Sequence, residues 1–445
     1  MHFNKGFIVL VCAVTAMGGL LFGFDTAVIS GAIPYITRYF KLDEYMLGWA
    51  VSAVLIGCAI GALASGKIAD RYGRRPVLIV GAVLFMASGI GAGLSHQLMI
   101  FIFFRLIGGL GVGSAAMVSP MYIAEIAPAN LRGRMVSLYQ MGIVLGILVA
   151  YFSNYLLDGV GVDNWRWMFM AQSFPSVLFG GLLLIIPESP RWLVMNGRVQ
   201  QATAVLARTV GNAEAFLQVA DIQNSIGPDV EGSTLGTISK SGRRLLFIGV
   251  LVAIFQQITG INAILYYAPV IFKETGLDGA SSLFQTIFIG IANVLSTFLA
   301  IGLVDKIGRR KLLLSGCLLM AISLAVVGAC FQYHYFGHYV VLIFLLIYVC
   351  TFASTLGAGV WVYLSEIFPN RIRGMALSIA TLSLWIADFA VTYAFPIMVK
   401  HLGTPATLFS YAIMCFVAFA YMSLNVKETK GKSLEEIEIL MTLKD

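Results

Sequence analysis

The sequence is poor in charge: only 11% of its 445 residues are Asp, Glu, Lys or Arg, whereas 59% are hydrophobic. A soluble globular domain carries about 25% charged residues, so this composition, with a mean hydropathy of +0.88, excludes that class. Histidine and cysteine are also scarce. The six cysteines all lie in apolar tracts without the spacing of a metal site, and we interpret them as small buried packing residues.

The motifs of common enzyme classes are absent too. We find no nucleophile elbow, Walker loop or HExxH pattern, so we expect no catalytic residues, no metal and no cofactor. The glycine-rich stretch GGLGVG (108–113) follows a helix-length apolar run rather than a strand, which favours close helix packing over dinucleotide binding. His334 and His338 are spaced to share a metal ion, but interfacial polar residues are the more common reading of such a pair.

Long apolar tracts are what the sequence has instead. About 20 apolar residues are enough for a helix to cross the ~30 Å hydrocarbon core of a bilayer. Twelve tracts reach this length, at residues 7–36, 46–66, 76–96, 101–124, 135–157, 167–187, 245–272, 280–304, 312–333, 339–365, 374–399 and 402–426. They are continuous rather than alternating, which favours helices over barrel strands. The sequence therefore predicts an all-α membrane protein with twelve transmembrane helices.

The basic residues predict how these helices are oriented. Most of the 29 Lys and Arg residues lie in the two termini and in alternate connections. The other side has only Arg38, Lys41, Arg166, Lys273 and Lys400. The positive-inside rule therefore places both termini in the cytoplasm of a multi-pass cell-membrane protein. Because topology accounts for the net charge of +7, we expect no nucleic-acid partner. The first tract is too long for a signal-peptide core and is interpreted as the first helix.

The chain also repeats itself. GKIADRYGRRP (66–76) matches GLVDKIGRRK (302–311), EIAPANLRGR (125–134) matches EIFPNRIRGM (366–375), and PESPRW (187–192) has a weaker echo in VKETKG (426–431). Two six-helix halves in a parallel repeat are therefore predicted. The predicted domains are an N-terminal bundle, a cytoplasmic linker with short amphipathic helices, a C-terminal bundle and a cytoplasmic tail, at residues 1–190, 191–242, 243–430 and 431–445.

The motifs in this order resemble the sugar porter family of the major facilitator superfamily. DRYGRR and DKIGRR follow the second and eighth predicted helices, PESPRW follows the sixth and KETKG the twelfth. RLIGGLGVG in the fourth helix and FQQITGINAILYYAP in the seventh add to the likeness, which covers essentially the whole chain. The resemblance implies the major facilitator fold, with a substrate site between the halves and alternating access.

The resemblance also implies which residues bind sugar. They are Phe22, Gln140, Gln256, Gln257, Asn262, Asn293, Trp361 and Trp385, to which we add Asp388. Neutral amides suit sugar hydroxyls because both groups donate and accept hydrogen bonds, and flat aromatic faces cover the C–H faces of a sugar ring. The alternative is that the amides join helices and the aromatics fill the core. The set as a whole favours the sugar site.

Some positions depart from the family pattern. TLGAGVW (355–361) lacks the prolines common in the tenth helix, which makes a break there less certain. Leu384 replaces a frequent sugar-binding amide, and Gln172 stands where some proton-coupled members have an acid. Asp388 lies mid-helix where relatives commonly have asparagine. We expect it to line the cavity and to hydrogen-bond substrate.

A third set of residues is implied to form gates. Tyr266 and Tyr267 would lie near the outer gate, and a charge network would close the cytoplasmic side. Its members are Asp70, Arg74, Arg75, Glu125, Arg132, Glu188, Arg191, Asp305, Arg309, Arg310, Glu366, Arg373 and Glu428. The alternative is that they are solvated loop charges that only fix topology. The recurrence of matched acids and bases in both halves favours the gate.

Asp25 is the only charged residue between Gly6 and Thr37, in the middle of the first predicted helix. Such an acid is costly, so it should be paired or functional, and the nearest intramembrane opposite charge is Arg105. In proton-coupled sugar porters these positions hold an acid and an arginine that pair, whereas facilitative members typically have asparagine. The resemblance thus implies that Asp25 and Arg105 couple transport to protons. The alternative is a permanent structural salt bridge.

The sequence therefore predicts a secondary transporter, not an enzyme, which takes up a hexose or pentose with a proton across the cytoplasmic membrane. We expect it to work as a monomer within the lipid bilayer. A facilitative sugar or cyclitol carrier and a membrane sugar sensor remain alternatives. A sensor is less favoured because only about twenty residues follow Val426, whereas sensors usually add a long cytoplasmic tail.

Overall fold

The computed structural model describes residues 4–128, 131–225, 240–368, 372–431 and 436–437. Within these ranges the chain forms helices and no β-strand. Eleven helical stretches are long and apolar enough to cross a membrane. The predicted span at 167–187 is the one not among them, because it is divided into two short helices. The prediction of an all-α protein built from apolar spans is confirmed.

Packing contacts divide the chain into two compact units. The first contains residues 1–28, 56–153 and 159–232, and the second contains residues 29–55, 154–158 and 233–445. The division predicted from the sequence repeat is different. Residues 29–55 and 154–158 group with the second unit, and most of the predicted linker groups with the first.

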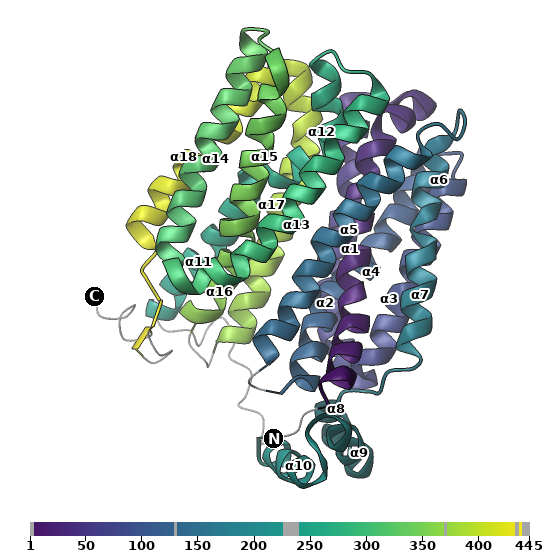
Figure 1. Cartoon of the computed structure of the whole chain (residues 1–445), viewed down its shortest axis with the longest axis vertical. Coiled ribbons are helices and arrows are strands. Elements are labelled where there is room, and N and C mark those ends of the chain that lie inside the picture. The colour runs from purple at the N-terminus through teal and green to yellow at the C-terminus, as the bar shows by residue number, and fades with distance from the viewer. Residues whose placement is uncertain (1–3, 129–130, 226–239, 369–371, 432–435, 438–445) are drawn as a thin grey trace. The chain divides into compact units, whose positions relative to one another are not determined.

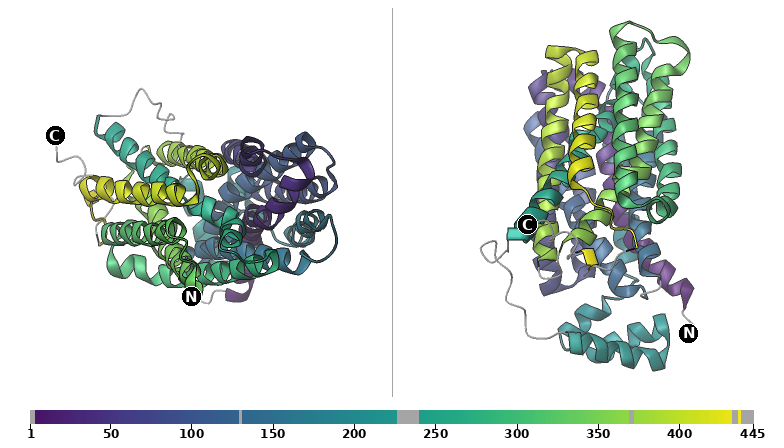
Figure 2. Two further views of the ribbon diagram at one scale, coloured as in Figure 1. Left: turned by 90° about the horizontal axis from the view of Figure 1, so that it is seen from above. Right: turned by 90° about the vertical axis from the view of Figure 1, so that its left-hand side faces the viewer.

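The first unit takes its helices from the N-terminal half of the sequence. Three of them belong to it only in part, namely α1 (Lys5–Phe40), α2 (Glu44–Tyr72) and α5 (Arg132–Leu157). The others are α3 (Arg74–Leu94), α4 (Leu98–Ile126), α6 (Asn164–Ala171), α7 (Ser173–Leu183), α8 (Pro190–Met195), α9 (Val199–Val210) and α10 (Asn212–Ser225). Helix α3 packs against α4, α6 and α7 (Figure 1). Helices α8, α9 and α10 pack on one another beside the N-terminus (Figure 2), within the predicted linker.

The second unit contains the remaining helices. These are α11 (Lys240–Ile258), α12 (Ile261–Glu274), α13 (Gly279–Ile307), α14 (Arg309–Gln332), α15 (Val340–Phe352), α16 (Ala358–Ile367), α17 (Arg373–Leu402) and α18 (Thr404–Asn425). Helix α14 packs closely against α18 and α15, and α11 packs against α17. Aromatic and ion-pair contacts tie residues 29–55 into this unit. The Trp49 and Phe389 ring centroids are 5.8 Å apart, and Glu44 Oε1 lies 3.4 Å from His401 Nε2.

Three predicted spans contain a local break, and each break has an identifiable cause. Between α6 and α7 the chain makes a tight turn at Gln172, since Pro175 has no N–H to donate to the carbonyl of Ala171. Between α11 and α12, Gly260 adopts a φ of 91°. The carbonyl of Thr259, left free by that break, accepts a hydrogen bond from the Tyr348 hydroxyl at 2.9 Å.

The third break replaces α-helix by one π turn, Ala353–Gly357, between α15 and α16. No proline is needed here. The Ser354 hydroxyl donates to the Cys350 carbonyl at 2.7 Å, and the Thr355 hydroxyl donates to the Thr351 carbonyl at 2.6 Å. Such bonds to the preceding turn compete with the helical ladder and bend helices. The tenth predicted span is therefore interrupted even though its sequence lacks the expected prolines.

At Gly260 a side chain is excluded both by the backbone conformation and by a close neighbour. A Cβ there would lie 2.9 Å from the Tyr411 ring, in addition to the positive φ. We expect Gly260→Ala to lower the free energy of unfolding by more than the about 1–3 kcal/mol of backbone strain alone. Thermal unfolding of the purified protein in detergent measures this.

Gly276→Ala is the matched control, since Gly276 has a φ of 92° but no atom within 4 Å of the added carbon. Gly276→Ala should lower the free energy of unfolding only by the backbone strain. Equal losses for both variants would show that the contact with Tyr411 contributes nothing.

Candidate functional site

Asp25 and Arg105 form a buried ion pair inside the first unit. Both residues are 0% exposed. The Arg105 Nη1 group donates to Asp25 Oδ1 at 3.1 Å, to Oδ2 at 3.0 Å and to the Asp25 backbone carbonyl at 3.3 Å. Helix α1 supplies the acid and α4 supplies the base. The predicted pairing of these two residues is confirmed.

One nitrogen of Arg105 makes all of its bonds to the acid. Its Nε and Nη2 groups have no acceptor among the residues that the structure describes. The guanidinium carbon instead lies 5.7 Å from the centroid of the Phe169 ring, a cation–π distance. The arginine is thus held by Asp25 and an aromatic face, and it depends strongly on the charge of that acid.

Small and neutral groups complete the surroundings of the pair. A Cβ at Gly108 would lie 3.3 Å from Asp25 Oδ1, so this glycine leaves room for the carboxylate, in line with the close packing predicted for GGLGVG. Gln172 Nε2 donates to the Phe85 carbonyl at 3.2 Å. Within the first unit the pair therefore has an amide nearby where the family pattern can have a second acid.

A second polar cluster lies in the second unit, at the break between α11 and α12. Asn262 Nδ2 donates to Gln257 Oε1 at 3.0 Å and to Asp388 Oδ2 at 2.8 Å. Thr392 Oγ1 lies 3.3 Å from Asp388 Oδ1. The break brings together two amides that a continuous helix would separate by five residues, and α17 supplies the acid. Thr392 was not among the predicted site residues, although it follows Asp388 by one helical turn.

The amide of Gln256 binds a different partner from the amide of Gln257. Its Nε2 group donates to the Leu356 carbonyl at 2.9 Å, which the π turn leaves available. Gln256 is 2% exposed, so its amide secures this turn to α11. The two adjacent glutamines therefore face different partners.

The other predicted sugar-site residues are less closely engaged. Trp385, Asn293 and both gate tyrosines, Tyr266 and Tyr267, are buried in the second unit. The ring of Tyr267 stacks on Phe395 with centroids 4.7 Å apart. Trp361 is 39% exposed. In the first unit Phe22 and Gln140 are half-buried.

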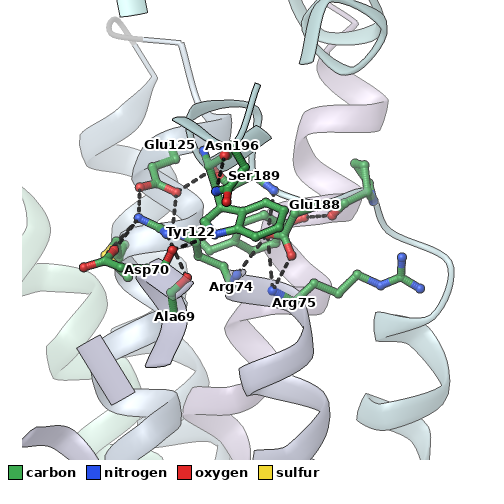
Figure 3. Close-up of polar contacts among 12 residues, drawn as sticks. Ala69, Asp70, Arg74, Arg75, Tyr122, Glu125, Glu188, Ser189 and Asn196 are labelled. Atoms are coloured by element: carbon green, nitrogen blue, oxygen red, sulfur yellow. Dashed lines mark hydrogen bonds and ion pairs between the residues drawn. The ribbon is translucent and has the colours of Figure 1, made fainter. Parts of the chain in front are cut away.

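A first charge network joins the α2–α3 connection to α4 and to the segment after α7. It is composed of Asp70, Arg74, Arg75, Glu125 and Glu188 (Figure 3). Arg74 Nε and Nη2 each lie 3.0 Å from a Glu125 carboxylate oxygen, and Nη2 lies 3.2 Å from Asp70. Arg75 donates instead to the carbonyls of Leu183 and Leu184, at 2.8 and 2.7 Å. Helices α2, α3, α4 and the segment after α7 are joined by these contacts.

Glu188 binds the N-terminus of α3. Its carboxylate accepts the backbone N–H of Arg74 at 3.0 Å and that of Arg75 at 3.1 Å. These are among the N–H groups that a helix leaves unpaired at its start, and they favour a negative charge. Gly73 precedes them with a φ of 105°, and a Cβ there would collide with the Glu188 carboxylate. The glycine of the DRYGRR motif is therefore needed for the carboxylate to approach.

The second unit repeats this arrangement in a second charge network, composed of Arg309, Arg310, Glu366 and Glu428. Arg309 Nη2 lies 2.9 Å from Glu366 Oε1. Glu428 accepts the backbone N–H groups of Arg309 and Arg310 at 2.9 and 3.2 Å, at the start of α14. Gly308, with a φ of 96°, stands where Gly73 stands in the first network. The repeat read from the sequence is thus a repeat of contacts.

Two hydroxyl groups were missed by the sequence reasoning. Ser189 Oγ donates to Glu125 Oε2 at 2.5 Å, and Thr429 Oγ1 donates to Glu366 Oε2 at 2.6 Å. Each follows the glutamate that binds the helix N-terminus, in PESPRW and in KETKG. The signal was therefore present in the repeat as a hydroxyl residue at matched positions.

The two N-terminal glutamates differ in their acidity. Burial raises the pKa of Glu188 above its ordinary value, although the N–H groups of Ser189, Arg74 and Arg75 oppose the effect. Burial acts in the same direction on Glu428, but the N–H groups of Lys430, Arg309, Arg310 and Thr429 prevail and its pKa is lowered. Glu188 is thus the easier of the two to protonate.

The contacts described for the two charge networks do not include four of their predicted members. Arg132 and Arg191 are exposed, with no ion pair to a described residue. Arg373 donates from Nε to the Phe368 carbonyl at 3.2 Å. The side chain of Asp305 lies outside the described residues.

Comparison with known proteins places this chain in a family. The model of the family described as "Sugar (and other) transporter" matches residues 11–441. The chain is 40% identical to a D-xylose-proton symporter of Escherichia coli, over 99% of this chain and 96% of that protein. It is 39% identical to an arabinose-proton symporter of Bacillus subtilis, over 98% and 96%. A glucose facilitated diffusion protein of Zymomonas mobilis is 38% identical, over 98% of both chains.

Solved structures show the same likeness. The inward-open form of the E. coli xylose transporter superposes with a TM-score of 0.87 at 40% sequence identity, covering 97% of this chain and 99% of that one. A D-xylose-proton symporter crystal structure gives a TM-score of 0.81 at 38% identity, covering 96% of this chain and 100% of that one.

The first charge network generates a stability prediction. Glu125→Gln removes the negative charge that pairs with Arg74, whose side chain is only 4% exposed. Breaking a buried pair in this way is expected to lower the free energy of unfolding by about 3 kcal/mol. Glu366→Gln should cost less, because the Arg309 and Glu366 side chains are 12% and 20% exposed. Thermal unfolding of the purified variants measures both.

Arg191→Gln provides the control for a surface charge, because Arg191 is exposed, and it should change stability by no more than about 0.5 kcal/mol. If Arg191→Gln is as damaging as Glu125→Gln, the network in Figure 3 is not what stabilises this end of the unit.

Proposed function

The chain belongs to the sugar transporter family of the major facilitator superfamily, and on that premise we propose that it takes up a monosaccharide together with a proton. The names of the E. coli and B. subtilis relatives, which are proton symporters for xylose and arabinose, support this proposal. So does the likeness to the solved structure of the E. coli xylose transporter. The observation that supports proton coupling in this proposal is the buried ion pair of Asp25 and Arg105.

The pair can bind and release one proton with little other change. Burial disfavours the ionised form of Asp25, while the guanidinium 3.0 Å away favours it. A proton on Asp25 removes the charge that holds Arg105, whose other nitrogens have no described acceptor. The protonated carrier can then rearrange when sugar is bound. One proton moving down 100 mV carries roughly 2.3 kcal/mol, enough for about 50-fold accumulation.

The sugar site in this proposal consists of the residues that the sequence named. Gln257 and Asn262 are its centre, because the break at Gly260 sets their amides against each other. Gln256 supports them from α11, where its amide donates to the π turn. Asn293, Trp361, Trp385, Phe22 and Gln140 complete the proposed site. Asp388 acts on it through Asn262.

The membrane orientation and the gates belong to the same proposal. Both termini and the two charge networks would lie in the cytoplasm of a multi-pass membrane protein, as the distribution of Lys and Arg favours. The networks, together with Arg132, Arg191, Asp305 and Arg373, would gate the inner side, and Tyr266 and Tyr267 the outer side. We propose that a single chain in the bilayer is the working unit.

The test of coupling is Asp25→Asn, which keeps the size of the side chain but cannot release a proton. We expect it to abolish accumulation of sugar against a gradient while sugar binding and exchange of sugar for sugar continue. The measurements are uptake of radiolabelled D-xylose, L-arabinose and D-glucose into proteoliposomes, with and without a pH gradient, and counterflow.

A structural bridge predicts a different outcome, namely a poorly folded variant in which Arg105 is buried and unpaired. Thermal stability of the same sample distinguishes the two. Accumulation by Asp25→Asn that still follows the pH gradient would sink the coupling proposal. Sugar equilibration by the wild type without any response to pH would instead identify a facilitative carrier.

The sugar site is tested by Gln257→Ala and Asn262→Ala. Each removes neutral hydrogen bonds worth about 0.5–1.5 kcal/mol, which predicts roughly 2- to 10-fold weaker sugar binding, with the fold intact. Asn425→Ala is the matched control, since this amide lies at the end of α18 and donates to the Tyr421 carbonyl of its own helix at 3.0 Å. Unchanged sugar affinity in both test variants, measured by calorimetry, would contradict the assignment.

A further inference from the structure

Asp388 is the second carboxylate buried within an apolar helix, and it lacks what Asp25 has. It is 2% exposed, in the middle of α17. Its described contacts are two neutral donors, Asn262 Nδ2 at 2.8 Å and Thr392 Oγ1 at 3.3 Å. No Lys, Arg or His nitrogen of a described residue lies within 4 Å of its carboxylate.

Charged groups on the helices packed around Asp388 all lie toward the helix ends. On α17 itself Arg373 is 15 residues away and Lys400 is 12, which is about 22 and 18 Å at a rise of 1.5 Å per residue. The others are Arg243 and Arg244 at the start of α11, Lys273 and Glu274 at the end of α12, Glu366 at the end of α16, and Glu44 of α2, which pairs with His401. Helix α18 contains no Asp, Glu, Lys, Arg or His.

The remaining titratable side chains on these helices near the break between α11 and α12 are phenols and the Cys415 thiol of α18, which donates to the Thr259 carbonyl at 3.8 Å. Tyr411 donates to the Val391 carbonyl at 3.5 Å, and Tyr267 stacks on Phe395, both within two turns of Asp388 on α17. A tyrosine is ordinarily neutral at physiological pH. Nothing described in the second unit therefore compensates a negative charge on Asp388 while it is buried, and burial of such a charge is strongly unfavourable.

The hydrogen-bond partners suit a protonated carboxyl group equally well. Asn262 can donate to Oδ2 in either form. Thr392 has a hydroxyl, which can accept a hydrogen bond as well as donate one, so it can accept from a proton on Oδ1. Every polar atom of the neutral acid then has a partner.

We propose that Asp388 is a second proton-binding site, loaded together with the sugar. The inference rests on the proposed function, because it assumes that sugar binds beside Asn262. A proton from the outer solution binds one carboxylate oxygen of Asp388 as the site closes and leaves to the inner solution when the site opens there. No covalent bond between heavy atoms changes. The carrier thus moves two protons per sugar, one on Asp25 and one on Asp388.

The link between this proton and the sugar is Asn262. Its one amide nitrogen donates both to Asp388 and to Gln257. A charged Asp388 attracts that amide strongly, and a neutral one leaves it freer to exchange its bond to Gln257 for a bond to a sugar hydroxyl. Two protons would raise the limit of accumulation at 100 mV from about 50-fold to about 2,500-fold.

The test uses Asp388→Asn, which keeps an acceptor for Asn262 but binds no proton. Protons taken up on sugar binding are counted with a pH indicator in weakly buffered detergent solution. The sugar is whichever of D-xylose, L-arabinose and D-glucose the wild type binds most tightly. We expect two protons per sugar for the wild type, one for Asp388→Asn, one for Asp25→Asn and none for the double variant.

The control is Ser383→Ala, on the same helix, whose hydroxyl donates only to the Ile379 carbonyl of its own turn. It should leave the count at two. A count unchanged by Asp388→Asn overturns this inference and leaves coupling through Asp25 standing. A wild type that takes up no proton refutes the proposed function itself.

Two further readouts make the result independent of how well one variant folds. In the wild type, the logarithm of sugar affinity should change with pH at a slope approaching two, and Asp388→Glu should keep that slope. A slope of one for the wild type overturns the proposal. Sugar binding that requires Na⁺ in the wild type, and not in Asp388→Asn, would identify a metal-cation site and overturn it as well.

Discussion

Charge buried among apolar helices must be compensated from within the bundle, and this constraint shapes each functional part of the structure. Asp25 is compensated by Arg105, and Arg74 by Glu125 and Asp70. Water cannot do this at 0% exposure, so the partners have to come from other helices and hold them together. The same contacts become the points at which adding or removing one proton changes the stability of a packing arrangement. In the proposed mechanism, compensation and coupling are therefore one property of the Asp25–Arg105 pair.

The two units share their charge networks but differ in their interiors. A glutamate binds the N-terminus of α3 in the first unit and of α14 in the second, each behind a glycine with positive φ. Inside, the first unit holds an ion pair, whereas the second holds a chain of neutral amides that ends at an acid without a described cation. This asymmetry suits the proposed function, in which the amides of the second unit bind a neutral, hydroxyl-rich ligand next to an acid that can take up a proton. The shared networks supply a similar frame for both.

The sequence predicted the features that depend on composition and on repetition. Apolar length gave the spans, and the repeated acids and bases gave most of both networks, since hydropathy and spacing are properties of the chain itself. The helix breaks were harder to predict from the sequence. Gly260 is one of 46 glycines, and only its φ of 91° and the approach of the Tyr411 ring show why a glycine is needed there. The contact of Asn262 with Asp388 joins residues 126 positions apart, and no local pattern encodes that distance.

The breaks explain why neutral groups dominate the second cluster. Each interruption frees backbone carbonyls inside an apolar bundle, where every polar atom needs a partner. The Tyr348 hydroxyl donates a hydrogen bond to the carbonyl of Thr259, and the Gln256 amide donates one to the carbonyl of Leu356. These single, neutral hydrogen bonds are worth about 1 kcal/mol net each and satisfy the carbonyls at the breaks, which leaves the amides of Gln257 and Asn262 for the proposed sugar. An amide hydrogen bond can be exchanged for a bond to a sugar hydroxyl without moving a charge. In the proposed mechanism the Asp25–Arg105 ion pair has to be neutralised by a proton first, so a carrier that uses a gradient needs both kinds of site.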